Sequence, residues 1–178
     1  MTWLPFQEHY NNESFNSVAL VKAGVLNIEK VGAHDRRILK IVRHPKFNKN
    51  YFDVAVVILD QSFVFDEDIQ PICLPNQAME TADFMNRYTI TVQGWGKDNS
   101  NGIPTDLTQV DLTIRNEKFC NSKYEKLPVN TKLILLPDLL ISSMFCADGN
   151  LNPTVGTCYG DSGGPSMIRS VKVLPPWI

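Results

Sequence analysis

The chain has 178 residues, with 17 Lys and Arg against 19 Asp and Glu and a formal net charge of −2. It therefore lacks the large basic surface with which proteins bind nucleic acid or an anionic membrane. A hydrophobic content of 43% excludes wholesale disorder. The apolar runs all fall well short of the ~20 residues that span a bilayer, and the length allows one good core or two small ones.

Short β-strands are expected along the whole chain. The predicted strands are rich in β-branched residues and cover 18–23, 37–42, 55–59, 88–92 and 109–114. Turn signals such as His44-Pro45 and Asn150-Leu-Asn-Pro153 separate them. Several short strands at this spacing favour an all-β barrel or sandwich.

The most informative motif is Gly160-Asp161-Ser162-Gly163-Gly164-Pro165. A serine attacks a carbonyl when its oxygen is exposed on a sharp turn and backbone N–H groups face the developing negative charge. Glycines around the serine allow that turn and a close approach to substrate. The motif therefore predicts Ser162 as a nucleophile, with the N–H groups of Gly160 and Ser162 as an oxyanion hole.

Extended to Cys158, this motif resembles the active-site sequence of the chymotrypsin/trypsin family of serine proteases. Further segments resemble that family in the family's order: Tyr51-Phe52-Asp53 before an apolar strand, Pro71-Ile72-Cys73-Leu74-Pro75, Val92-Gln93-Gly94-Trp95-Gly96 and Met144-Phe145-Cys146-Ala147. The resemblance implies a chymotrypsin-like pair of six-stranded antiparallel β-barrels, with a short helix near 116–124. Residues 1–75 would form part of the N-terminal barrel and the interbarrel linker, and residues 76–178 part of the C-terminal barrel.

In this family a His takes the proton from the serine, and a buried Asp orients the His. Asp53 is the candidate orienter, and the alternative is a turn residue at the end of a strand. The separation of His9 from Asp53 resembles the family's, but Gln7-Glu8-His9-Tyr10 replaces the expected Ala-Ala-His-Cys. His34 and His44 lie in polar segments where a structural role is expected.

The resemblance also assigns the four cysteines. Cys120 and Cys146 would form a disulfide, Cys73 would bridge to a pro-region, and Cys158 would pair with a strand beyond Ile178. Another bridge of the family is replaced by Ile90 and Ile168, which is compatible with an apolar pair in its place. The spacings of Cys and His do not favour a metal site, and no cofactor is expected.

The residue six before the nucleophile lines the primary specificity pocket in the family. It is Gly156 here, where a trypsin-like enzyme has Asp, so a small or medium apolar side chain is the expected preference. Asp161 resembles the carboxylate that pairs with a new N-terminal amine on activation. The chain lacks an Ile-Val-Gly-Gly start, a secretory signal peptide and a Ser-Trp-Gly strand. It is therefore expected to be shortened at both ends and poorly active alone.

These features predict a serine endopeptidase homologue that acts on protein or peptide substrates and is extracellular by resemblance. No nucleic-acid or membrane partner is expected. One alternative is a non-catalytic protease homologue that binds partners in an extracellular cascade. The other is an incomplete gene model.

Overall fold

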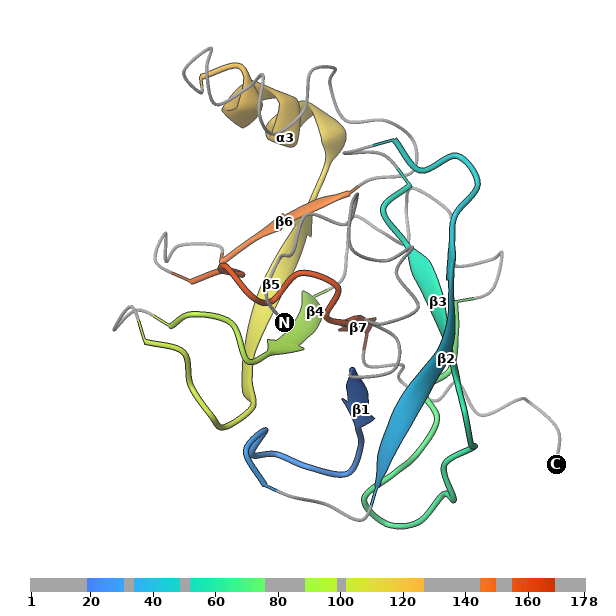
Figure 1. Ribbon diagram of the computed structural model, residues 1–178. Coiled ribbons are helices and arrows are strands. Elements are labelled where there is room, and N and C mark those ends of the chain that lie inside the picture. Colours follow the sequence, from blue (N-terminus) through green and yellow to red (C-terminus); the bar gives the residue numbers. More distant parts are fainter. Residues whose placement is uncertain are drawn as a thin grey trace, which may run out of the picture.

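The computed structural model describes residues 19–30, 34–48, 52–75, 89–98, 102–126, 145–149 and 155–168. These residues form seven strands in two antiparallel sheets, and one helix (Figure 1). The first sheet has the order β1-β2-β3, with β1 (Leu20–Lys22), β2 (Asp35–Arg43) and β3 (Ala55–Leu59). The second has the order β6-β5-β4-β7, with β4 (Thr89–Gly94), β5 (Thr108–Arg115), β6 (Cys146–Asp148) and β7 (Ser166–Ile168).

The predicted all-β class is confirmed, and each of the five predicted strands has its counterpart in β1 to β5. The helix expected near 116–124 is present as α3 (Glu117–Tyr124). The Asn116 side chain begins it by accepting the N–H of Phe119 at 2.8 Å, and Glu117 places a negative charge in the first turn. Sequence reasoning did not find β6 and β7, which have three residues each.

The hydrophobic core lies on one face of the four-stranded sheet. In β4, Ile90 and Val92 are buried, and the register sets them opposite Leu112 and Val110 of β5. The alternate residues form a polar face, where the Thr91 hydroxyl donates to Asp111 at 2.6 Å. Two-residue periodicity therefore explains both faces, because successive side chains of a strand point to opposite sides.

The apolar replacement expected at Ile90 and Ile168 is present. The two residues are direct partners in the β4–β7 ladder, and Ile168 packs against the cluster to which Ile90 belongs. An apolar cross-strand pair thus joins the strands at the position of the family's bridge.

The three-stranded sheet is less buried than the four-stranded sheet. Its strands contribute no buried side chain among the described residues, and apolar side chains such as Leu39 and Val56 are 65% and 63% exposed. A bulge between Ile38 and Lys40 inserts Leu39 as an extra residue opposite β3. Because the bulge shifts the alternation, Ile38 and Ile41 both lie on the less exposed face.

Loops near Leu26 join the two halves of the chain. The Leu107 N–H donates to the Leu26 carbonyl at 2.7 Å, and the Trp95 indole N–H donates to the same carbonyl at 3.1 Å. Asn27 and Asp106 form an isolated antiparallel bridge beside these bonds. This contact connects the loop after β1 to the segment that leads into β5.

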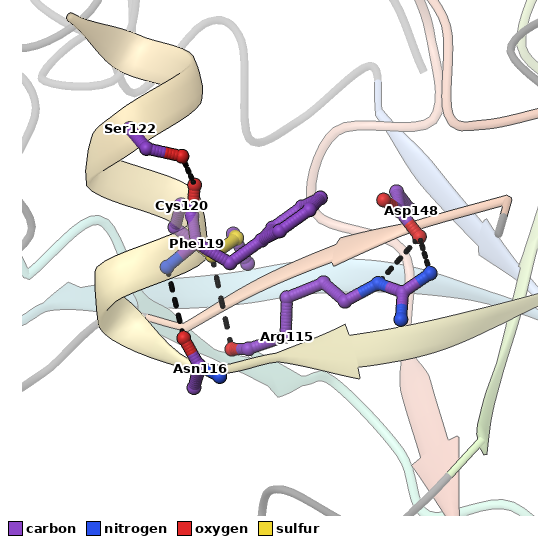
Figure 2. Close-up of a disulfide and its surroundings, with 7 residues drawn as sticks. Arg115, Asn116, Phe119, Cys120, Ser122 and Asp148 are labelled. Carbon is purple, nitrogen blue, oxygen red and sulfur yellow. Dashed lines mark hydrogen bonds and ion pairs between the residues drawn. A yellow bond between two sulfur atoms is a disulfide. The ribbon is translucent and has the colours of Figure 1, made fainter.

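The predicted disulfide between Cys120 and Cys146 is confirmed, with their Cα atoms 6.3 Å apart. It ties α3 to β6, and Figure 2 shows its surroundings. Arg115, the β5 partner of Cys146, forms an ion pair with Asp148 of β6 at 2.8 Å. Its guanidinium carbon lies 5.3 Å from the centroid of the Phe119 ring. Within the described ranges, no helix has the length and apolarity to cross a membrane.

Candidate active site

The loop that carries Ser162 consists of two consecutive turns that lead into β7. The Asp161 N–H donates to the Cys158 carbonyl at 3.0 Å, and the Gly164 N–H donates to the Asp161 carbonyl at 2.9 Å. Gly160 and Gly163 have φ angles of 103° and 80°, values that residues other than glycine rarely adopt. The glycines therefore fold the chain sharply around an exposed Ser162.

Asp161 holds this loop to the end of β4. One carboxylate oxygen accepts the Gly96 N–H at 2.9 Å, and the other accepts the Cys158 N–H at 2.8 Å. A Cβ on Gly96 would come within 3 Å of both carboxylate oxygens, so the close approach needs glycine at that position. Hydrogen bonds to a charged acceptor are stronger than neutral ones, and Asp161 thus fixes the loop on both sides.

Two backbone N–H groups at the serine have no acceptor in the part of the chain that the structure describes. Within residues 155–168 and the other described ranges, the N–H groups of Gly160 and Ser162 donate to no protein acceptor. Asp161, which lies between them, and Gly164, two residues after Ser162, use their N–H groups in the turns. An oxyanion hole requires backbone N–H groups without an internal acceptor beside the nucleophile.

Asp53 lies two residues before the first residue of β3, a strand of the other sheet. Its side chain is exposed and, in the part of the chain that is described, has no hydrogen-bond or ion-pair partner. Partial burial nevertheless raises the pKa of the Asp53 carboxyl above 3.8. Phe52 before it has a φ of 54°, a strained value for an aromatic residue, and such strain is often found at functional sites.

The structure describes two of the three histidines. His9, the candidate base, lies outside the described residues. His44 stacks on Phe52 with ring centroids 4.9 Å apart, and its Nδ1 accepts the Lys46 N–H at 3.2 Å. His34 is half-buried and directly precedes β2.

A pocket of about 380 Å³ lies between the ends of β4 and β5 and the segment before the serine loop. Gly156 and Asp161 both line it. A Cβ at Gly156 would meet no atom within 4 Å, so this position has room for a side chain. Pockets of this size accommodate small ligands or single side chains.

Cys73 and Cys158 are exposed and are not in a disulfide. Cys158 lies beside the pocket and donates its N–H to Asp161, so it is part of the framework of the serine loop. Sequence reasoning recognised Gly94-Trp95-Gly96 as a family segment but missed the contact of Gly96 with Asp161. The two glycines flanking a tryptophan were the only sign of a close approach.

Comparison with known proteins identifies similar sequences over most of the chain. A family model described as Trypsin matches residues 11–174. Serine protease snk of Drosophila melanogaster is 34% identical over 151 residues, which cover 82% of this chain and 32% of the relative. Serine protease filzig of Drosophila melanogaster is 30% identical over 146 residues, covering 80% of this chain and 8% of the relative.

A human relative, Serine protease 41, is 36% identical over 117 residues, covering 64% of this chain and 33% of the relative. The chain thus spans a third or less of the length of these three relatives.

Proposed function

Because this chain belongs to the trypsin family of serine proteases, we propose that it carries a site for peptide-bond hydrolysis with Ser162 as the nucleophile. The Ser162 oxygen would attack the scissile carbonyl while a His takes its proton. The His would return that proton to the leaving amine, and water would then release the acyl group from the serine. The N–H groups of Gly160 and Ser162 would bind the oxyanion in both steps.

The observation that carries this proposal is the serine loop itself. Gly160 and Gly163 have positive φ, and Asp161 fixes the loop to β4. The N–H groups of Gly160 and Ser162 have no acceptor among the described residues. Catalysis by preorganised donors depends on such fixed geometry, because no reorganisation is then needed as charge develops. A plain glycine-rich surface turn would need neither these donors nor the anchored carboxylate.

The proposed triad draws on both parts of the chain. In the proposed division, residues 1–75 supply Asp53 and His9, and residues 76–178 supply Ser162. Asp53 suits the role of orienter because its carboxylate has no partner within the described ranges. His9 is proposed as the base on its spacing alone. Because its neighbours depart from the family pattern, we propose that the chain by itself has low activity.

For substrate, we propose proteins or peptides with a small or medium apolar side chain at the cleavage position. Gly156 supports this, since it adds no charge to the pocket and leaves room within it. An extracellular location is proposed from the family, and the Cys120–Cys146 disulfide supports an oxidising compartment. The exposed Cys73 is available for the proposed bridge to a pro-region.

A fluorophosphonate probe tests this function, because its reaction needs an activated serine but little side-chain specificity. We expect incomplete labelling of the 178-residue chain at Ser162, located by peptide mass spectrometry and lost in Ser162→Ala. Ser166→Ala is the matched control and keeps the label, since Ser166 lies in β7 beyond the turns.

Two other outcomes are informative. Complete labelling that His9→Ala abolishes would contradict the low activity and establish His9 as the base. A complete absence of label would contradict the catalytic proposal and favour the non-catalytic homologue, in which the same fold binds a partner without cleaving it.

A further inference from the structure

Trp95 directly follows β4 and connects it to a loop that is distant in sequence. Its indole N–H donates to the Leu26 carbonyl at 3.1 Å, in the loop that follows β1. The Leu107 N–H donates to the same carbonyl at 2.7 Å, so this acceptor is fixed from a second side. Figure 1 shows the loop after β1 beside the segment that leads from β4 into β5. The indole bond therefore attaches the end of β4 to the half of the chain that contains Asp53.

The backbone next to Trp95 binds the serine loop. The Gly96 N–H donates to the Asp161 carboxylate at 2.9 Å. The next N–H along the chain, that of Lys97, donates to the Tyr159 carbonyl at 2.9 Å. A Cβ on either glycine that flanks Trp95 would overlap the Asp161 carboxylate, so this carboxylate packs directly against the backbone of the segment.

The side-chain contact of Trp95 restricts this backbone. Glycine has more backbone freedom than other residues, so Gly96 by itself does little to fix the direction of its own N–H. That N–H belongs to the peptide group that joins Trp95 to Gly96, and a peptide group is planar and rigid. Holding the Trp95 ring at Leu26 therefore limits the directions in which the Gly96 N–H can point, and with them the position of Asp161.

We propose that Trp95 is a positioning residue for Ser162. Its hydrogen bond to the Leu26 carbonyl holds the Gly96 N–H at the Asp161 carboxylate, and this contact keeps the serine loop in the arrangement that reacts. The inference rests on the proposed function, because it assigns a reactive arrangement to the loop. Leu26 contributes a backbone carbonyl, so the indole N–H is the part of the bond that a substitution can remove.

Replacing Trp95 by benzothienylalanine tests this hydrogen bond, because a sulfur atom takes the place of the indole N–H and the ring keeps its shape. The probe is an alkyl fluorophosphonate, applied to the full 178-residue chain. We expect the second-order rate constant for labelling of Ser162 to fall by roughly three- to tenfold, the range that corresponds to one neutral hydrogen bond.

Hydrogen exchange of the Gly96 amide provides a second readout that needs no reaction. Followed by NMR in the ¹⁵N-labelled chain, it reports the bond to Asp161. We expect this exchange to become faster by a similar factor when the indole N–H is removed. Exchange of the amides paired between β4 and β5 should stay unchanged, because the local opening at Gly96 does not require the sheet to open.

Asn27→Ala is the matched control. The Asn27 side chain donates to Asp106 at 2.9 Å and to Thr105 at 3.2 Å. It therefore joins the same two loops, but its described hydrogen bonds do not include Gly96 or the serine loop. The substitution should lower the free energy of unfolding at least as much as the change at Trp95 does. Labelling and the exchange of the Gly96 amide should keep their wild-type rates.

Three results would overturn the proposal. If labelling and Gly96 exchange both keep their wild-type rates without the indole N–H, the bond to Leu26 is dispensable. Equal slowing of labelling by Asn27→Ala would assign the effect to the contact between the loops and not to Trp95. Faster exchange throughout β4 and β5 would assign it to a general loss of stability.

Failure of the proposed function gives a different result, in which the wild type takes no label. The Gly96 amide then still tests whether Trp95 holds the serine loop. Faster exchange without the indole N–H would support that part of the inference, and unchanged exchange would overturn it.

Discussion

The two sheets of this protein use similar sequence patterns and reach different degrees of burial. In the four-stranded sheet, Ile90 and Ile114 are each 3% exposed. In the three-stranded sheet, Val56 and Leu39 are 63% and 65% exposed. This is so although β3 consists entirely of aliphatic residues and β2 contains four of them. Among the described residues from 19 to 75, only Ile69, outside the strands, is buried.

This difference shows that the sequence of an apolar strand determines which of its faces is apolar, but not which other element packs against that face. The core of the four-stranded sheet forms because Ile168 and Ala147, from the two short outer strands, pack against β4 and β5. Ser162 lies four residues before β7, in a loop that Asp161 bonds to Gly96 at the end of β4, whereas Asp53 precedes a strand of the exposed sheet. A catalytic residue on a well-packed element is held more rigidly. The following predictions test this contrast.

The largest effect is expected from the disulfide of the packed region. Replacing Cys120 and Cys146 together by Ser should lower the free energy of unfolding by about 3–4 kcal/mol, because the bridge closes a loop with a sequence separation of 26. Urea unfolding followed by circular dichroism measures the change. Cys73→Ser is the control and should change the free energy by less than about 0.5 kcal/mol, since Cys73 is exposed and free. Equal losses would contradict this prediction.

Matched truncations compare the two sheets directly. Ile90→Ala should cost about 3 kcal/mol, because it leaves a cavity in the packed core. Ile58→Ala removes the same atoms from a side chain that is 41% exposed and should cost less than about 1 kcal/mol. Urea unfolding of both variants provides the measurement. If Ile58→Ala proves as costly as Ile90→Ala, the three-stranded sheet is covered in solution.

A pair of glycine substitutions tests how the serine loop is anchored. Gly96→Ala should cost about 2 kcal/mol, since its methyl group would overlap the Asp161 carboxylate. It should also slow fluorophosphonate labelling of Ser162. Gly156→Ala adds the same methyl group where no atom lies within 4 Å, and its stability should match that of the wild type. A stable, normally labelled Gly96→Ala would show that the Asp161 contact is dispensable.

The smallest effect concerns Asp53. Because burial raises the pKa of Asp53 in the folded chain, the folded state binds this proton more tightly than the unfolded state does. Stability should therefore fall slightly as the pH rises from about 3.8 through the folded pKa, and Asp53→Asn should remove that part of the fall.

Thermal unfolding between pH 3 and 7 measures this difference. Glu67→Gln, at an exposed acid outside the strands, is the control for loss of a negative charge. If stability falls more, or rises less, between pH 3 and 7 for Asp53→Asn than for the wild type, the sign is wrong.

Most of the fold was predictable from local sequence. β-branched composition and turn signals located β1 to β5, and the family resemblance located α3 and the Cys120–Cys146 bridge. β6 and β7 were missed because Cys-Ala-Asp contains no β-branched residue and Ser-Met-Ile only one, so neither segment has the composition of a strand. Their existence depends on pairing with β5 and β4, which are distant in sequence.

The candidate site was likewise predictable from the sequence only in part. The sequence by itself identified Ser162 and the glycines of its turn, since a sharp turn depends on backbone freedom that only residue type controls. It could not reveal that Asp161 accepts the Gly96 N–H, a contact between residues 65 positions apart. Nor could it reveal which apolar strands are buried. Both were decided by tertiary structure, because a hydrogen bond or a core requires a partner that local sequence does not contain.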